Sequence, residues 1–157
     1  MSPQPPNELI RALREHGVPF VVIGGHAVSF HGYVRATEDL DVVWARSPQA
    51  ETALLAALTA INASWISDDR DPATGLERLV PVSAAHIRAE HLIMLVTDHG
   101  FLDLFDYVPG CPEADVAQFM ADSVEADGVR YCSLAWLRRM KHAAGRPRDV
   151  ADLENLP

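Results

Sequence analysis

The sequence has little cysteine, no long apolar run and a shortage of positive charge. Its two cysteines, Cys111 and Cys132, lie far apart and outside any metal-ligand spacing, so we expect two free thiols in a cytoplasmic protein. No apolar run approaches about 18 residues, and no membrane span is therefore expected. The stretch from Met1 to Asn7 is proline-rich and polar, which argues against a signal peptide.

The balance of charged residues limits which partners the protein can bind. The chain carries 13 Lys and Arg against 22 Asp and Glu, a formal net charge of −9. Phosphates of nucleic acids repel such a protein, so tight nonspecific binding to RNA or DNA is not expected. Positive charge concentrates only in the segment Arg138 to Arg148, which leaves a local nucleic-acid patch open.

The length of 157 residues suits one domain, 1–157, which can bury a hydrophobic core without disulfides or structural metals. We expect a disordered tail over 1–6 and a helical segment over 133–157. Hydrophobic periodicity and the positions of Gly and Pro predict the elements between. The predicted helices cover 7–16, 26–31, 48–61, 113–121, 134–144 and 147–156. The predicted strands cover 20–23, 40–45, 79–82, 91–97, 101–108 and 129–132, with a loop over 67–75. This order predicts an α/β (α+β) fold, a mixed sheet flanked by helices.

The first chemical signal is a glycine pair followed by two aspartates. Gly24 and Gly25 end the first predicted strand, where they allow a sharp turn and the close approach of a phosphate. Asp39 and Asp41 alternate with Leu40 on the next strand, so both carboxylates point to one side. Two converging carboxylates repel each other unless a cation lies between them, and Mg²⁺ held by carboxylates and substrate phosphates is the usual solution.

A second acidic strand follows at Phe101 to Asp106. A carboxylate within an apolar strand is costly unless it is paired or bound to a metal. Asp103 and Asp106 face opposite sides of the strand, so only one of them can join the first two aspartates directly, and the spacing alone leaves the choice open.

These motifs, taken in order, resemble the polymerase-beta-type nucleotidyltransferase superfamily. The form Gly24-Gly25-His26-Ala27 with Arg35-x-Thr37-x-Asp39-Leu40-Asp41 is similar to its small bacterial members, which include toxins of abortive-infection and toxin–antitoxin systems. The C-terminal motif of lysine and aspartates also resembles that group, here Lys141-x-x-x-Gly145 followed by Asp149 and Asp152.

The resemblance implies a nucleotidyltransferase fold and transfer of a nucleoside monophosphate from a nucleoside triphosphate (NTP) to an acceptor, with Mg²⁺ or Mn²⁺ as cofactor. It implies metal binding and catalysis by three carboxylates, Asp39, Asp41 and Asp103. It implies a set of nucleotide-binding residues, namely Gly24, Gly25, His26, Arg35, Thr37, Lys141 and Asp152. The acceptor is RNA, a protein or a small molecule, and an antitoxin is an implied partner.

Three alternatives stay open at this level. Many members of the superfamily have Ser or Thr after the glycine pair, whereas His26 stands here, which leaves either a histidine contact or weakened activity. Lys141 borders the apolar face of its helix and either reaches inward or extends to solvent. The alternative function is an inactive module of the same fold that binds a nucleotide or a partner protein.

Overall fold

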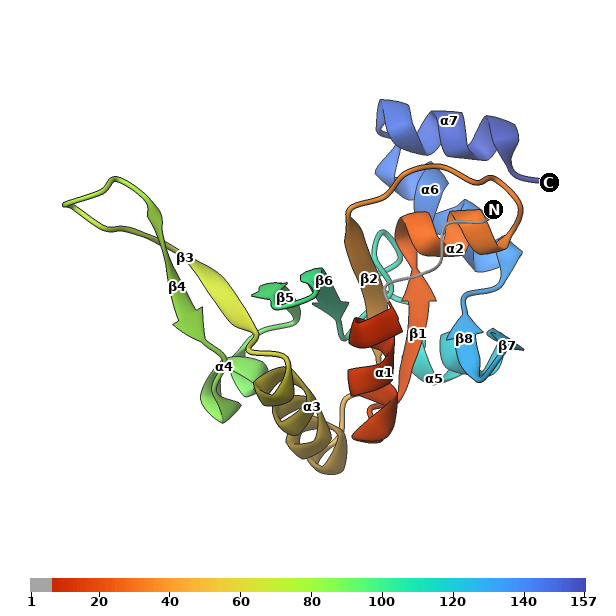
Figure 1. The fold of residues 1–157 in the computed structure, drawn as a ribbon. Helices are drawn as coiled ribbons and strands as arrows, with labels where there is room; N and C mark the ends of the chain where they lie inside the picture. Colours follow the sequence, from red (N-terminus) through yellow and green to blue (C-terminus); the bar gives the residue numbers. More distant parts are fainter. Residues whose placement is uncertain (1–6) are drawn as a thin grey trace.

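The computed structural model describes residues 7–157, so the tail expected over 1–6 lies outside the described residues. The chain alternates helices and strands throughout (Figure 1). The helices are α1 (Asn7–Glu15), α2 (Gly24–Phe30), α3 (Pro48–Ala60), α4 (Ala84–Ala89), α5 (Val116–Ala121), α6 (Leu134–Ala144) and α7 (Pro147–Asn155). The strands are β1 (Phe20–Ile23), β2 (Asp39–Trp44), β3 (Ser64–Arg70), β4 (Glu77–Pro81), β5 (Leu92–Thr97), β6 (Gly100–Phe105), β7 (Val124–Ala126) and β8 (Val129–Tyr131).

All eight strands form one mixed sheet in the order β4-β3-β5-β6-β2-β1-β8-β7. β2 lies in its interior, antiparallel to β1 and parallel to β6. The interior position suits its sequence, because Val42, Val43 and Trp44 are fully buried. The predicted mixed sheet with flanking helices is therefore confirmed.

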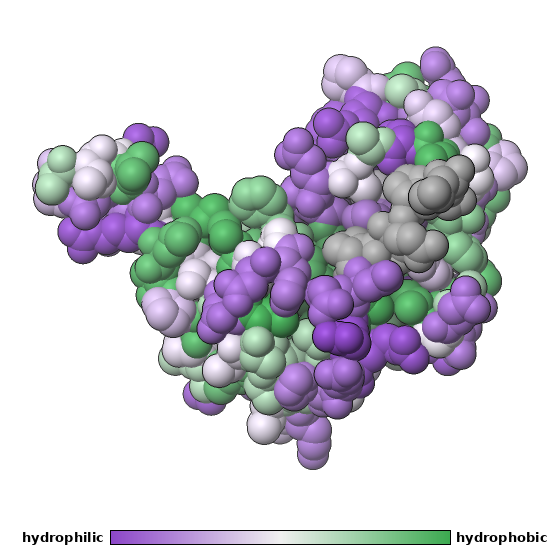
Figure 2. Space-filling view, in the orientation of Figure 1, coloured by the Kyte–Doolittle hydropathy of each residue, from purple (hydrophilic) through white to green (hydrophobic). Residues whose placement is uncertain are grey.

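The two faces of the sheet are covered unequally. On one face α1, α3 and α4 enclose the larger core, to which Leu13, Leu54 and Ile87 contribute. On the other face α2, α5 and α6 form a second core with β1 and β2, around Val28 and Phe119. The β3–β4 hairpin projects away from this second layer, and the surface between the two is hollowed (Figure 2).

Most predicted elements occur within one or two residues of the predicted bounds, and the region of 64–90 differs most. The segment 67–75 was predicted as a loop from its composition, but β3 continues to Arg70 and only the tip is irregular. The polar residues Asp68 and Asp69 are exposed and lie at an irregularity of the ladder, between Ile66 and Arg70, which pair with β4. The sequence analysis also missed α4 and β7, and it began α5 three residues early, since Asp115 caps that helix.

Both cysteines are free and buried, as predicted. Within residues 7–157 no helix combines the length and the apolar character needed to cross a bilayer.

The core against α3 makes a simple prediction about stability. Leu54 is fully buried between α3 and the sheet, so Leu54→Ala should lower the free energy of unfolding by about 2–5 kcal/mol. Leu76→Ala is the matched control, because Leu76 is 69% exposed and its truncation should change little. Urea denaturation measures both, and equal effects would contradict the assigned core.

Candidate active site

The site is built on the pairing of β2 with β6. Asp41 stands directly opposite Asp103, and Asp39 lies two residues earlier on the same face of β2. All three are half-buried, whereas Leu40, Leu102 and Leu104 on the other face are fully buried in the core. The alternation that fills the core thus brings the three aspartates to one side, as the sequence predicted.

A glycine corner lies against this acidic group. Gly24 has a φ of +66°, and a Cβ added there would overlap the Oδ2 of Asp41. A Cβ on Gly25 would lie 2.6 Å from the Oγ1 of Thr37. The corner therefore has no room for side chains, and its backbone is part of the wall around the carboxylates.

The carboxylates repel each other and lie away from bulk water. Burial raises the pKa of Asp41 to about 7, and the neighbouring charge of Asp103 adds to the shift. Burial also raises the pKa of Asp103. Burial and the neighbouring charges therefore favour a proton on this pair near neutral pH. A cation placed between them would replace that proton.

The choice between Asp103 and Asp106 is clear from their contacts. Asp106 lies on the other side of β6, where its Oδ2 accepts hydrogen bonds from Arg46 Nε at 2.7 Å and from His91 Nδ1 at 2.9 Å. Its charge is therefore balanced locally. Asp103 lines the pocket beside Asp41.

A pocket of about 530 Å³ opens in front of the acidic group, a volume in the range of small-molecule sites. Its lining joins β2 and β6 with the loop before β2 and with the start of α7. The residues lining it are Gly24, Gly25, Arg35, Ala36, Thr37, Glu38, Asp39, Asp41, Asp103, Phe105, Lys141, Arg146 and Arg148.

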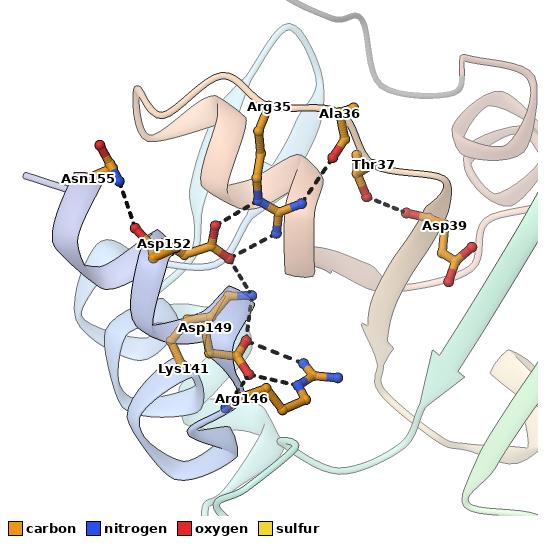
Figure 3. A network of polar contacts seen from close by, with 10 residues as sticks. Arg35, Ala36, Thr37, Asp39, Lys141, Arg146, Asp149, Asp152 and Asn155 are labelled. Carbon is orange, nitrogen blue, oxygen red and sulfur yellow. Dashed lines mark hydrogen bonds and ion pairs between the residues drawn. The ribbon is translucent and has the colours of Figure 1, made fainter.

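One wall of the pocket is held by a network of ion pairs between distant segments (Figure 3). Arg35 donates from Nε and from a terminal nitrogen to both carboxylate oxygens of Asp152, at 2.6 and 2.8 Å. Lys141 Nζ lies 2.9 Å from Asp152 and 3.0 Å from Asp149, and Arg146 Nε donates to Asp149 at 2.7 Å. With three cations and two anions, the network keeps an excess of one positive charge beside the pocket.

The pKa values show that these pairs are strong. Burial alone would raise the pKa of Asp149, but hydrogen bonds from Arg146 and Lys141 outweigh it and lower that pKa to about 2. The same opposition, with Arg35 and Lys141 as donors, lowers the pKa of Asp152. Both aspartates are therefore ionised at neutral pH and fix the cations around them.

The predicted nucleotide-binding residues divide into two groups. Gly24, Gly25, Arg35, Thr37 and Lys141 line the pocket. His26 and Asp152 are buried and do not line it. Burial and the charge of Arg35 lower the pKa of His26, so its imidazole is neutral. Asp152 contacts the pocket only through Arg35 and Lys141.

Sequence reasoning did not select five residues of the lining, namely Ala36, Glu38, Phe105, Arg146 and Arg148. Glu38 follows from its place beside Asp39. The two arginines flank Pro147 at the start of α7, and their basic segment is visible in the sequence. The sequence does not show that this segment lies near the aspartates, because its position depends on how α7 packs through the ion pair of Lys141 with Asp152.

The donor set suits a hard divalent cation that is bound together with phosphates. Within residues 7–157 no three His, Cys, Asp or Glu side chains are already arranged as a metal cage. Mg²⁺ commonly uses one or two carboxylates and takes its other ligands from water and phosphate. Asp41 and Asp103, opposite each other at the glycine corner, supply such a pair.

Comparison with known structures identifies the type of fold. No family model matches the sequence, and no curated protein matches it. Among solved structures, the nucleotidyltransferase ANT(2'')-Ia, an antibiotic-resistance factor, aligns with a TM-score of 0.57 and 16% identity over 94% of this chain and 78% of its own. The chain has a nucleotidyltransferase-type fold.

Two Helicobacter pylori structures align less well. JHP933 has a TM-score of 0.49 at 18% identity, and a proposed nucleotidyltransferase has 0.44 at 16%. Each alignment covers 94% of this chain, which spans 62% of the first protein and 64% of the second.

The raised pKa of Asp41 predicts a pH-dependent gain in stability for Asp41→Asn. The folded protein holds a proton that the unfolded chain releases near pH 3.8, so stability falls as pH rises toward 7. The variant lacks this loss, so its stability relative to wild type should rise by about 2–3 kcal/mol between pH 5 and pH 8. Thermal denaturation at both pH values measures this, with Asp68→Asn as control. Parallel pH profiles would contradict it.

The crowding at the glycine corner predicts that Gly24→Ala lowers the free energy of unfolding by more than backbone strain at positive φ alone would. Gly75→Ala is the matched control, since its φ of +70° is close to that of Gly24 but nothing lies within 4 Å. Both changes should lose about 1–2 kcal/mol from the left-handed backbone. Gly24→Ala should lose at least a further ~1 kcal/mol because Asp41 must move. Urea denaturation compares them, and equal losses would refute the close approach.

Proposed function

We propose that this protein is a nucleotidyltransferase that uses Mg²⁺ or Mn²⁺ and transfers a nucleoside monophosphate from an NTP to an acceptor hydroxyl. The observation that carries the proposal is the meeting of Asp39, Asp41 and Asp103 at a corner where two glycines leave no side chain. The nucleotidyltransferase-type fold is in agreement with it.

The metal would be held by Asp41 and Asp103, with Asp39 beside them. When bound, it would neutralise negative charge on the entering and leaving oxygens of the phosphoryl centre. Because two half-buried carboxylates stand directly opposite each other, a cation between them would relieve a repulsion that a separated surface pair lacks.

The protein residues would then orient the two substrates. An acceptor oxygen bonds to the α-phosphorus, and the bond from that phosphorus to the bridging oxygen of the β-phosphate breaks, so pyrophosphate leaves. The acceptor hydroxyl gives its proton to a carboxylate. Asp103 suits that role because it lines the pocket beside Asp41, where an acceptor hydroxyl can reach it.

The triphosphate would lie toward the cationic wall. Arg148 lines the pocket and makes no ion pair within residues 7–157, so its charge is available to a phosphate. Arg35 and Lys141 also line the pocket, although Asp152 holds them in place. We propose that Gly24, Gly25 and Thr37, which lie next to Arg35, contact the phosphates as well.

One observation favours the alternative, a module that binds a nucleotide without transferring it. Lys141 Nζ already pairs with Asp149 and Asp152, which leaves only one of its three N–H donors for a direct contact with a phosphate. An antitoxin partner, a toxin–antitoxin role and a cytoplasmic location stay predictions of the sequence.

The proposal predicts transfer of label that depends on two opposed carboxylates. The protein is incubated with each α-³²P-labelled NTP, Mg²⁺ or Mn²⁺, and cell extract. Wild type should label an acceptor, and Asp41→Ala or Asp103→Asn should lower the rate at least ~100-fold, because charge neutralisation at the reacting phosphate is lost.

Glu125→Gln, at an exposed carboxylate on β7 that does not line the pocket, is the control and should retain full transfer. Calorimetry with each NTP separates the two candidate functions. Binding without transfer by wild type would favour the module, and transfer that survives both aspartate substitutions would refute the proposed site.

A further inference from the structure

The face of the sheet that carries the carboxylates continues beyond them as exposed apolar surface. The cross-strand pairs show which residues share this face. Asp41 pairs with Asp103, Asp103 pairs with Met94, and Ile66 pairs with Leu79. The pairing of Trp65 with Leu95 places Ile66 beside Met94 in the same row. One row across five strands therefore leads from the acidic group to the hairpin.

The apolar members of this surface are open to solvent. Ile66, Leu79 and Met94 are 37%, 56% and 57% exposed, and Phe101, next to Asp103 on the same face of β6, is 46% exposed. We name these four residues the exposed apolar face. Their neighbours Ile93, Leu95 and Leu102 point the other way into the core, so the exposure belongs to one side of the sheet.

The exposed apolar face is open to solvent because the helices on that side of the sheet, α2, α5 and α6, do not extend over it. Among the described residues, α2, α5 and α6 pack against β1 and β2 and reach no further than Phe105 on β6. Apolar residues gather where the hairpin joins the body, beside the hollow between the two (Figure 2). A contiguous apolar surface that borders a polar site is typical of a binding surface.

The charges around the pocket are divided between its two sides. The cations Arg35, Lys141, Arg146 and Arg148 all lie on the wall formed by α6, α7 and the loop before β2. The hairpin at the other side, residues 64–81, carries four carboxylates against two guanidinium groups. Its carboxylates are Asp68, Asp69, Asp71 and Glu77. A phosphate-rich ligand is attracted to the first side and repelled from the second.

From this division we infer that the exposed apolar face binds the acceptor, and that the acceptor is a basic, amphipathic polypeptide segment. Its apolar side chains cover Met94, Ile66 and Leu79, its basic side chains meet the acidic hairpin, and a hydroxyl side chain reaches Asp103. This assignment rests on the proposed function and adds the class of acceptor to it.

The length of the face favours a polypeptide over a small molecule. With strands about 4.8 Å apart, the row from Asp103 to Leu79 is about 14 Å long, which matches about four extended residues. RNA is disfavoured because its phosphates would lie among the carboxylates of the hairpin.

Binding is tested first with defined probes, without NTP. The full chain is titrated into a fluorescein-labelled ten-residue peptide of alternating Leu and Lys with a central Ser, and binding is followed by fluorescence anisotropy. The same peptide with Glu in place of Lys, and a ten-nucleotide single-stranded RNA, are the competitors. The cationic peptide should bind at least ~10-fold tighter than either competitor.

The face itself is tested with Met94→Gln and Ile66→Gln. Each should weaken binding of the cationic peptide about 10-fold, since burial of one apolar side chain is lost. Val124→Gln and Val150→Gln are matched controls, 43% and 47% exposed on other surfaces, and should bind as wild type does. Thermal denaturation verifies that all four variants fold.

Four outcomes would overturn the inference: equal affinity for both peptides, tighter binding of RNA, no effect of the two substitutions, or a dimer in light scattering that Met94→Gln dissociates. NTP binding and label transfer are measured in the same proteins. Wild type that binds the peptide but transfers no label from any NTP would refute the proposed function alone. Met94→Gln that transfers label to the peptide as fast as wild type does would refute this inference alone.

Discussion

The pairing of Asp41 with Asp103 across β2 and β6 is the constraint on which the candidate site depends. Parallel strands with fully buried leucines on one face bring two carboxylates together on the other, where burial and mutual repulsion raise their pKa values. The sheet can hold this arrangement because hydrophobic packing on the core side outweighs the repulsion. The same hydrophobic contacts that stabilise the fold therefore hold the two carboxylates close together, where a cation would be bound favourably.

The rest of the site compensates for that repulsion at a distance. Arg35, Lys141 and Arg146 come from a loop and two helices, and Asp149 and Asp152 hold them within a largely buried network. Removing one member of such a network leaves a buried charge without a partner, which is costly. The network consequently fixes α7 against α6 and the loop before β2, and it keeps a positive field beside the pocket.

Much of the fold was predictable because local patterns and tertiary packing agree. The apolar run at Phe20 to Ile23, the cap at Ser133 and the left-handed Gly145 all predict elements that the structure contains. The hairpin was missed because Asp68 and Asp69 have low strand propensity, and the pairing of the flanking residues Ile66 and Arg70 with β4 is a tertiary contact that the local sequence does not show. The positions of the three aspartates followed from alternation, whereas the engagement of Lys141 did not, because helical spacing shows where a side chain starts and not which partner it meets.

The ion pair between Arg35 and Asp152 joins residues 117 positions apart. At about 5–20 residues per second, a ribosome needs on the order of 10 s to make the second partner after the first. During that interval the nascent chain can pair its early strands, but the guanidinium of Arg35 has no carboxylate to hold it. The cationic wall is thus among the last parts of the molecule to be completed, and a chain still being translated carries an unfinished pocket.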